Sequence, residues 1–226
     1  MKKTIWIIFF LLLLAADLVA IYLGNETLRT ISKPLLVPVL MVYFLVQTSP
    51  VISGLKLWII LALFFSWVGD ILLLFDQKGP IFFLLGLSTF FIAQVFYIIF
   101  FHNIRMKEYI RGNALFLLLV VVYYGILISL LSPYLGEMKL PVRIYGVVIS
   151  FMLMLAMHML FCRNKKAGWW MMIGAILFVT SDSLLAFNKF YSPFNYAEII
   201  VMLTYGLAQL FITDGAVQYI NWKKNK

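Results

Sequence analysis

Two aspartates lie inside long apolar stretches of the sequence, with no basic residue beside them. Asp70 belongs to FFSWVGDILLLF (residues 64–75), and Asp182 belongs to ILFVTSDSLLAF (residues 176–187). An ionisable group at membrane depth costs ~2.5–3.5 kcal/mol on insertion scales and usually serves a function. In such surroundings the ionised form is disfavoured, so one carboxyl of a close pair can stay protonated while the other is ionised. Such a pair can act as a general acid and a general base.

Polar side chains accompany both aspartates. Those that could face a common cavity are Ser66, Ser181, Tyr205 and Gln209. Ser66 lies one turn before Asp70, and Ser181 directly precedes Asp182. Tyr205 and Gln209 are four residues apart and therefore share one face of a helix. The alternative is that the two aspartates share a proton or bond the serines, and only lock the helices together.

The sequence contains too few suitable residues for metal chemistry or for a serine nucleophile. The two histidines, His102 and His158, are too few for a three-histidine zinc site. His158 and the single Cys162 form at most a two-ligand fragment, so we expect no metal site. No histidine lies at the depth of Ser66 or Ser181, where a serine nucleophile would need a base. Carboxyl acid–base chemistry is the chemistry that remains.

The elements that must position these residues are membrane helices. Of the 226 residues, 64% are hydrophobic and 12% are charged. Runs of ~20 apolar residues span a hydrocarbon core of ~30 Å, and lipid cannot bond the backbone, so each run must be helical. The eight predicted spans are residues 4–24, 34–48, 55–75, 80–101, 112–132, 142–162, 168–187 and 197–220.

The predicted fold class is therefore all-α, a polytopic transmembrane bundle of about eight helices that forms one integral-membrane domain over residues 1–226. Six of the seven prolines, Pro34 and Pro50 among them, fall at predicted helix ends. Only Pro38 lies inside a span, so a kink is expected in the second helix.

The basic residues predict the orientation of the bundle. A net charge of +9 would suggest nucleic acid as the partner of a soluble protein, but here it forms the rim of a membrane protein, and we expect no nucleic-acid partner. Two thirds of the 18 Lys and Arg residues lie on one side, where Lys2 and Lys226 mark the two ends of the chain. The positive-inside rule then predicts that both termini are cytoplasmic. We expect the membrane to be a plasma membrane of bacterial type.

With this orientation, three aspartates lie at one depth. Asp17, Asp70 and Asp182 each lie ~14 residues along an outward-running helix, which is ~21 Å from the cytoplasmic face. This shared level predicts a common polar cavity in the outer half of the membrane, although Asp17 has fewer polar neighbours. Asp214 lies near the cytoplasmic end of the last helix and is expected to be interfacial.

The two halves of the chain carry similar segments. GDILLLF and then AQVF (residues 93–96) parallel SDSLLAF and then AQLF (residues 208–211). A duplicated four-helix unit would explain the likeness. Chance similarity between leucine-rich segments would explain it equally well.

Four segments resemble the YhhN-type membrane family. They are KPLLVP at residues 33–38, FSWVGDILL at 65–73, GAILFVTSDSLLAFNKF at 174–190 and YGLAQLFI at 205–212. The resemblance runs in order over nearly the whole chain. One departure is Gln94, at a position that is often histidine in that family, and this bears on activity or substrate choice.

Characterised members of that family are lysoplasmalogenases. The resemblance implies hydrolysis of the vinyl ether of a lysoplasmalogen, a lysophospholipid, to a fatty aldehyde and glycerophosphocholine or glycerophosphoethanolamine, without a metal or organic cofactor. Asp70 and Asp182 would be the catalytic pair, and Lys33 would hold the phosphate. Tyr205 and Gln209 would orient water or the ether oxygen. The rival interpretation is a proton- or ion-coupled transporter of a small or lipidic solute that uses the same two carboxyls.

Overall fold

The chain folds into long helices in a computed structural model that describes residues 3–49 and 51–224. Within this part of the chain the long helices are α1 (Lys3–Tyr22), α2 (Glu26–Thr48), α3 (Leu55–Leu73), α4 (Pro80–Lys107), α5 (Ala114–Leu131), α6 (Lys139–His158), α7 (Lys165–Ala186) and α8 (Ala197–Lys224). Short helical turns link them: η1 (Asp76–Lys78), η2 (Gly136–Met138), η3 (Met159–Phe161) and the π-helical η4 (Phe187–Tyr191). The all-α prediction is confirmed.

Each of the eight helices is long and apolar enough to cross a membrane, so the chain is a multi-pass membrane protein. Lys2 and Lys226, used for the predicted orientation, lie outside the described residues, as does Pro50, which was expected to mark a helix end. The orientation of the bundle in the membrane stays a prediction.

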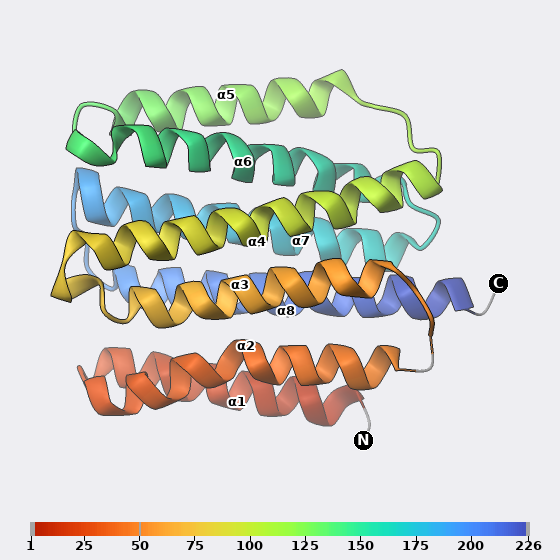
Figure 1. Cartoon of the computed structure of the whole chain (residues 1–226), viewed down its shortest axis with the longest axis horizontal. Coiled ribbons are helices and arrows are strands. Elements are labelled where there is room, and N and C mark those ends of the chain that lie inside the picture. The colour runs from red at the N-terminus through yellow and green to blue at the C-terminus, as the bar shows by residue number, and fades with distance from the viewer. Residues whose placement is uncertain (1–2, 50, 225–226) are drawn as a thin grey trace.

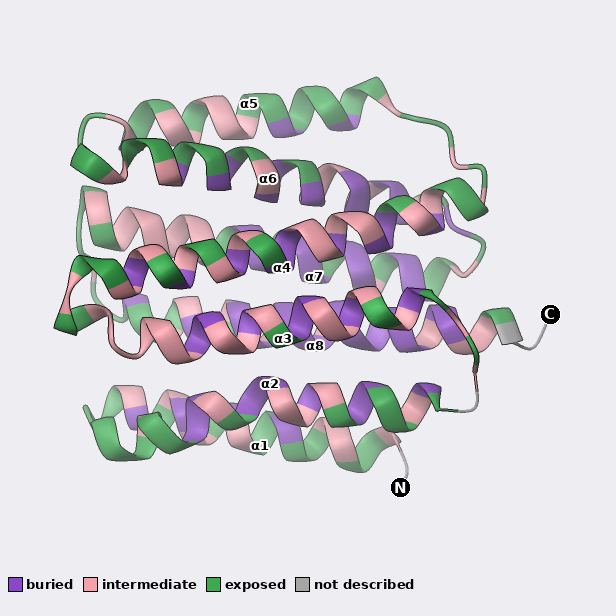
Figure 2. Ribbon diagram, in the orientation of Figure 1, coloured by how far each residue is buried: buried purple, intermediate pink, exposed green. Residues whose placement is uncertain are grey.

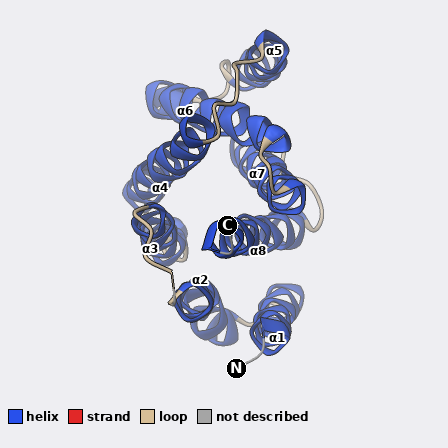
Figure 3. Ribbon diagram, turned by 90° about the vertical axis from the view of Figure 1, so that its right-hand side faces the viewer, coloured by secondary structure: helices blue, strands red, loops and turns tan. Residues whose placement is uncertain are grey.

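The helices run side by side, and both ends of the chain lie at the same end of the bundle (Figure 1). In the end-on view α8 occupies the interior, and α5 lies at the periphery against α6 (Figure 3). Accordingly, α8 is the most buried of the eight helices, whereas most of α5 is exposed (Figure 2). The exposed residues of α5 are mainly leucine and valine, which suits a helix that faces lipid.

The second helix begins earlier than predicted. It starts at Glu26 instead of residue 34, because the side chain of Asn25 caps it by accepting a hydrogen bond from the Leu28 amide at 2.9 Å. Pro34 was expected at a helix end and instead lies inside α2 together with Pro38.

Each internal proline leaves the carbonyl four residues before it without its usual amide donor. The carbonyl that Pro38 frees is that of Pro34, and the indole of Trp67 on α3 donates to it at 2.8 Å. A side chain from the neighbouring helix therefore replaces the missing backbone donor. The correction also moves Lys33 from the start of the helix to a buried position within it.

Gly69 and Gly174 bring neighbouring helices close together. A Cβ added at Gly174 would lie 2.7 Å from the Ile212 amide nitrogen on α8. At Gly69 it would lie 2.7 Å from the ring of Phe90 on α4. The pairs α3–α4 and α7–α8 therefore pack closely, while the predicted duplication of a four-helix unit stays a prediction.

Candidate active site

A cavity of about 360 Å³ opens at the end of the bundle away from the two chain ends. Its polar lining includes Lys33, Asp70, Ser181, Asp182 and Tyr205. These residues come from α2, α3, α7 and α8. Much of the remaining wall is apolar, with contributions from Leu73, Phe83, Leu87, Phe90, Val142, Leu185, Val201 and Met202. The structure thus brings the two aspartates singled out in the sequence to one cavity.

Asp70 is 2% exposed and is held by a chain of hydrogen bonds. The Tyr205 hydroxyl donates to Oδ2 of Asp70 at 2.7 Å. The Gln209 amide nitrogen donates to the Tyr205 hydroxyl at 3.2 Å, and the Tyr97 hydroxyl donates to Gln209 Oε1 at 2.6 Å. Gln209 does not line the cavity, so its contact with the site runs through Tyr205.

Asp182 is half-buried and has a tyrosine of its own. The Tyr145 hydroxyl, on α6, donates a short hydrogen bond to Oδ2 of Asp182. The amide of Gln94, on α4, lies beside that hydroxyl. Gln94 is fully buried, yet neither its oxygen nor its nitrogen has a hydrogen-bond partner of normal geometry among the described residues. The support behind Asp182 is therefore less complete than the support behind Asp70.

The two candidate serines have different surroundings. The hydroxyl of Ser181 donates to the Val201 carbonyl on α8 at 2.9 Å and so ties α7 to α8 beside the cavity. Ser66 is fully buried but does not line the cavity, and its hydroxyl has no partner within the described part of the chain. Only Ser181 is placed to touch a molecule in the cavity.

Lys33 is the most buried of the basic residues that line the cavity, with 8% of its surface exposed. Among the described residues it makes no ion pair, whereas two other basic residues of the lining do. Arg29 pairs with Glu198 at 2.5 Å, and Lys189 pairs with Asp76 at 2.8 Å. Lys33 and Asp70 line the same cavity, and the charge of Lys33 acts on Asp70.

Asp17 lies outside the cavity lining. Its carboxylate accepts a hydrogen bond from the Ser32 hydroxyl at 2.6 Å, between α1 and α2. It is fully buried, and the charge of Lys33 acts on it as well as on Asp70. Asp17 therefore adds to the electrostatics of the site but is not placed to touch a bound molecule.

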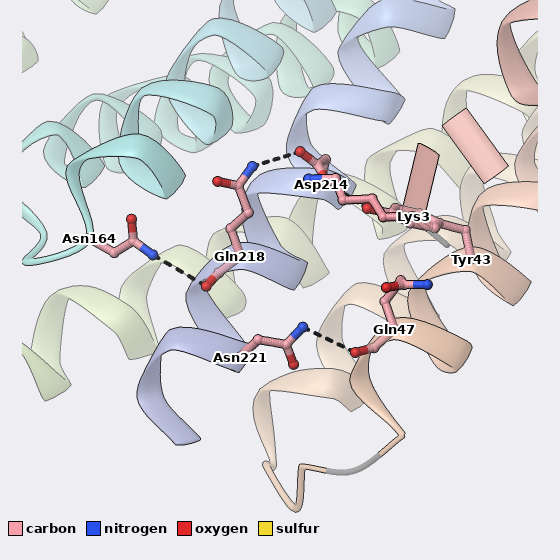
Figure 4. A network of polar contacts seen from close by, with 7 residues as sticks. All are labelled: Lys3, Tyr43, Gln47, Asn164, Asp214, Gln218 and Asn221. Carbon is pink, nitrogen blue, oxygen red and sulfur yellow. Dashed lines mark hydrogen bonds and ion pairs between the residues drawn. The ribbon is translucent and has the colours of Figure 1, made fainter. Parts of the chain in front are cut away.

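The fourth aspartate, Asp214, belongs to a separate network nearer the chain ends (Figure 4). Lys3 forms an ion pair with it at 2.6 Å, and the Tyr43 hydroxyl donates to it at 2.5 Å. The Gln218 amide donates to its second oxygen at 2.7 Å. Asn164 extends the network by donating to the backbone carbonyl of Gln218 at 3.3 Å. These bonds join α1, α2 and α8 and reach the start of α7.

Two tyrosines of the site were not considered from the sequence. Tyr145 looks like an ordinary residue of an apolar helix, and Tyr97 lies among phenylalanines. A depth comparison could have found Tyr145, because α6 and α7 run in opposite directions and place it near the level of Asp182. For Tyr97 only the three-residue spacing from Gln94 was visible, which points to a shared helix face but not to Gln209.

Both ring nitrogens of His158 already have hydrogen-bond partners, which leaves neither free for other chemistry. Nδ1 of His158 lies 2.7 Å from the Met154 carbonyl, and Nε2 accepts a hydrogen bond from the Asn113 amide at 3.1 Å. Cys162 donates to the Asn164 carbonyl at 3.0 Å. Within the described residues no three His, Cys, Asp or Glu side chains are grouped so as to hold a metal ion.

Known proteins match most of this chain. The human lysoplasmalogenase TMEM86B is 33% identical over 158 residues, 70% of this chain and 62% of the human protein. The lysoplasmalogenase TMEM86B of Rattus norvegicus is 32% identical over 180 residues, 79% of this chain and 69% of the rat protein. A lysoplasmalogenase of Mycobacterium bovis is 27% identical over 161 residues, 70% of this chain and 59% of its own length.

The matched stretch thus spans less than two thirds of the human and mycobacterial relatives. No solved structure matches the chain. The sequence profile of the YhhN family matches residues 28–216, which include every residue of the cavity lining from α2 to α8 except Glu26. The chain belongs to the YhhN family.

Proposed function

We propose that the chain is a lysoplasmalogenase that cleaves the vinyl ether bond of lysoplasmalogens. The products are a fatty aldehyde and glycerophosphocholine or glycerophosphoethanolamine. The relatives named lysoplasmalogenase support this proposal. The observation that carries it is the placement of Asp70 and Asp182 in one cavity, each bonded to a tyrosine and neither in an ion pair within the described residues.

This arrangement suits the chemistry of a vinyl ether. Cleavage begins with slow protonation of a carbon atom, which produces an oxocarbenium ion that water then captures. The first step needs a protonated acid close to the carbon, and the second needs a carboxylate that stabilises the cation and activates water. Two carboxyls in one cavity meet both needs without a metal or an organic cofactor. Tyr205 is part of the lining and donates its single hydrogen to Asp70, so its oxygen is left to orient water.

The cavity also suits the rest of the lipid. Its apolar wall accommodates an alkenyl chain, and the bundle is open to lipid on its outside. Lys33 holds the phosphate, because an unpaired ammonium in a buried cavity is a strong site for an anion. Only the three-carbon glycerol unit separates the phosphate from the ether, so a cation near the carboxyls is suitably placed.

The orientation follows from the charge distribution. With both termini cytoplasmic, the cavity opens toward the opposite face of the plasma membrane. Reporter fusions in the segment around Arg163 test this, because that loop lies at the same end of the bundle as the termini. A reporter that is active only outside the cytoplasm would contradict the proposed orientation.

Aldehyde release by purified protein in detergent tests the activity. We expect release from 1-alkenyl lysophosphatidylethanolamine and none from the matched 1-alkyl lipid, which lacks the double bond that must be protonated. Detergent removes any ion gradient, so hydrolysis must proceed without one. Absence of release, together with gradient-driven uptake of a solute into vesicles, would replace the hydrolase by a transporter.

A further inference from the structure

The hydrogen-bond chain behind Asp70 has a fixed direction. It runs from Tyr97 to Gln209, from Gln209 to Tyr205, and from Tyr205 to Asp70. Tyr97 ends the chain and is fully buried, and its only hydrogen-bond partner in the described part of the chain is Gln209. The hydroxyl hydrogen of Tyr97 therefore has one acceptor, the Gln209 carbonyl oxygen.

Reversal of the chain would leave a buried donor unused. If Asp70 donated to Tyr205, then Tyr205 would have to donate to a flipped Gln209, whose nitrogen would point at Tyr97. The hydroxyl hydrogen of Tyr97 would then have no acceptor, and a buried donor without an acceptor is costly. The end of the chain therefore holds Asp70 as an acceptor at Oδ2.

The charged groups around Asp70 and Asp182 also differ, and this difference again favours the ionised form at Asp70. Asp70 shares the cavity with the Lys33 ammonium of α2, whose charge acts on it, and the carboxyl of Asp17 on α1 acts on Asp70 in the opposite sense. From α8 it meets the Tyr205 hydroxyl, and α4 packs against this part of α3 with the ring of Phe90. A nearby cation favours the ionised form of a carboxyl.

Asp182 has no comparable set of stabilising neighbours among the described residues. The groups that act on it are the hydroxyl of Tyr145 on α6, the carboxyl of Asp70 on α3 and, from α5, Tyr123. Lys189 lines the same cavity but is paired with Asp76. The Tyr145 hydrogen bond by itself favours the ionised form of Asp182, but the neighbouring Asp70 carboxylate and the removal from water favour the protonated form.

We infer that the two carboxyls have different roles: Asp182 is the acid that protonates the vinyl carbon, and Asp70 is the carboxylate that activates water. Tyr97 and Gln209 are positioning residues that hold Asp70 in its accepting state through Tyr205. This inference rests on the proposed hydrolysis. It assigns a function to two residues, Tyr97 and Gln209, that do not line the cavity.

The proton transfers balance over one turnover. Asp182 gives its proton to the vinyl carbon, the π electrons form the new C–H bond, and an oxocarbenium ion results. Water adds to the cation while Asp70 takes a proton from it, which gives a hemiacetal. The hemiacetal C–O bond to glycerol then breaks. Asp70 returns its proton to the glycerol oxygen, and Asp182 takes the hydroxyl proton as the aldehyde forms.

Deuterium exchange distinguishes the two roles. In deuterium oxide, Asp70→Asn still contains the acid, but water capture is impaired, so protonation of the vinyl carbon reverses. We expect unhydrolysed substrate recovered from Asp70→Asn to contain deuterium at that carbon, and substrate recovered from Asp182→Asn to contain none. Exchange with Asp182→Asn, or with neither variant, would overturn the assignment.

A pH profile tests the positioning residues. Tyr97→Phe removes the hydrogen that sets the direction of the chain, so Asp70 stays protonated over a wider pH range. We expect the acid limb of kcat/KM to move to higher pH, with a several-fold loss below the optimum and an unchanged alkaline limb. Tyr43→Phe is the matched control, because Tyr43 is also a buried tyrosine in a network that contains an aspartate.

A purely structural role for Tyr97 would lower activity equally at every pH, and that result would overturn its assignment. Measurements on the wild-type protein distinguish failure of the proposed function from failure of the division of roles. If it releases no aldehyde at any pH, the proposed function fails and the inference fails with it. If it releases aldehyde, but Tyr97→Phe moves the alkaline limb of the pH profile or Asp182→Asn is the variant that exchanges deuterium, the hydrolase proposal holds. Only the division of roles then fails.

Discussion

Two regions of this bundle contain aspartates whose surroundings are opposite in kind. Asp214 has a cation, a tyrosine and an amide as partners: Lys3 at 2.6 Å, Tyr43 at 2.5 Å and Gln218 at 2.7 Å. Asp70 and Asp182 have one tyrosine each and share a cavity. The residue type is the same in both regions, so the residue type alone does not indicate a functional site.

The difference lies in what remains available to a ligand. A buried charge is tolerated when it is paired and hydrogen-bonded. Both oxygens of Asp214 accept hydrogen bonds, so this carboxylate joins helices and has little capacity left. Asp70 and Asp182 each have a second oxygen without a hydrogen bond in the described structure, and both face a cavity that also contains the unpaired Lys33.

The largest effect is expected when a single lysine is replaced, and it should differ between the two regions. Lys33→Met should lower kcat/KM by about 10- to 100-fold, because one charge-assisted contact to the phosphate is lost. Lys3→Met, the matched change in the other region, should leave kcat/KM unchanged and lower the unfolding temperature. Steady-state kinetics and thermal unfolding of both variants in detergent measure this. Equal activity of the two variants would remove Lys33 from the site.

A change at the α7–α8 contact should lower the stability of the whole bundle. In Gly174→Ala the added methyl group would meet the backbone of Ile212, which cannot rotate away as a side chain can. We expect a loss of about 1–3 kcal/mol in unfolding free energy. Gly125→Ala, in open space on α5, is the control and should be neutral or slightly stabilising. The comparison would fail if both variants unfolded at the same temperature.

Smaller effects are expected within the Asp214 network. Gln218→Ala removes one of the three partners of that carboxylate and should destabilise the protein by about 1 kcal/mol. Aldehyde release should stay within twofold of the wild type, because the network does not line the cavity. Chemical unfolding and activity assays on one preparation would check both statements. A large loss of turnover at normal stability would connect this network to the chemistry.

The smallest effect is expected at Ser66. Its buried hydroxyl has no partner in the described part of the chain, so Ser66→Ala removes an unsatisfied polar group and should be neutral or slightly stabilising. Ser181→Ala should cost up to about 1 kcal/mol, because it loses the bond to the Val201 carbonyl. Unfolding temperatures of the two variants give the comparison. A fall in turnover for Ser66→Ala would return this serine to the site.

Helices of known rise place residues at calculable levels, and on this basis Asp17, Asp70 and Asp182 were predicted to share one cavity. Asp70 and Asp182 do line one cavity, but Asp17 lies outside it and bonds Ser32 instead.

The sequence pattern did not predict the start of α2, since a proline that looks like a helix end is tolerated when Trp67 bonds the freed carbonyl. It also gave no sign that Lys3 would reach Asp214. That contact depends on how α1 packs against α8, and hydrophobic pattern does not encode helix neighbours.

The same limit explains the missed tyrosines. Tyr145 and Tyr97 come from helices whose order around the bundle is set by side-chain packing, for example by the glycines that let α7 approach α8. A count along one helix finds polar residues on that helix. It does not find the hydroxyl that a second helix supplies.

The most direct measurement compares three variants in one series: Asp70→Asn, Asp182→Asn and Asp214→Asn. Aldehyde release and thermal unfolding would be measured on the same purified samples. We predict that the first two lose about 100-fold or more in turnover at nearly unchanged stability, as expected when an acid or base is removed. Asp214→Asn should keep its turnover and unfold at a lower temperature. Full turnover in either of the first two variants, or its loss in a stable Asp214→Asn protein, would contradict the division between the two regions.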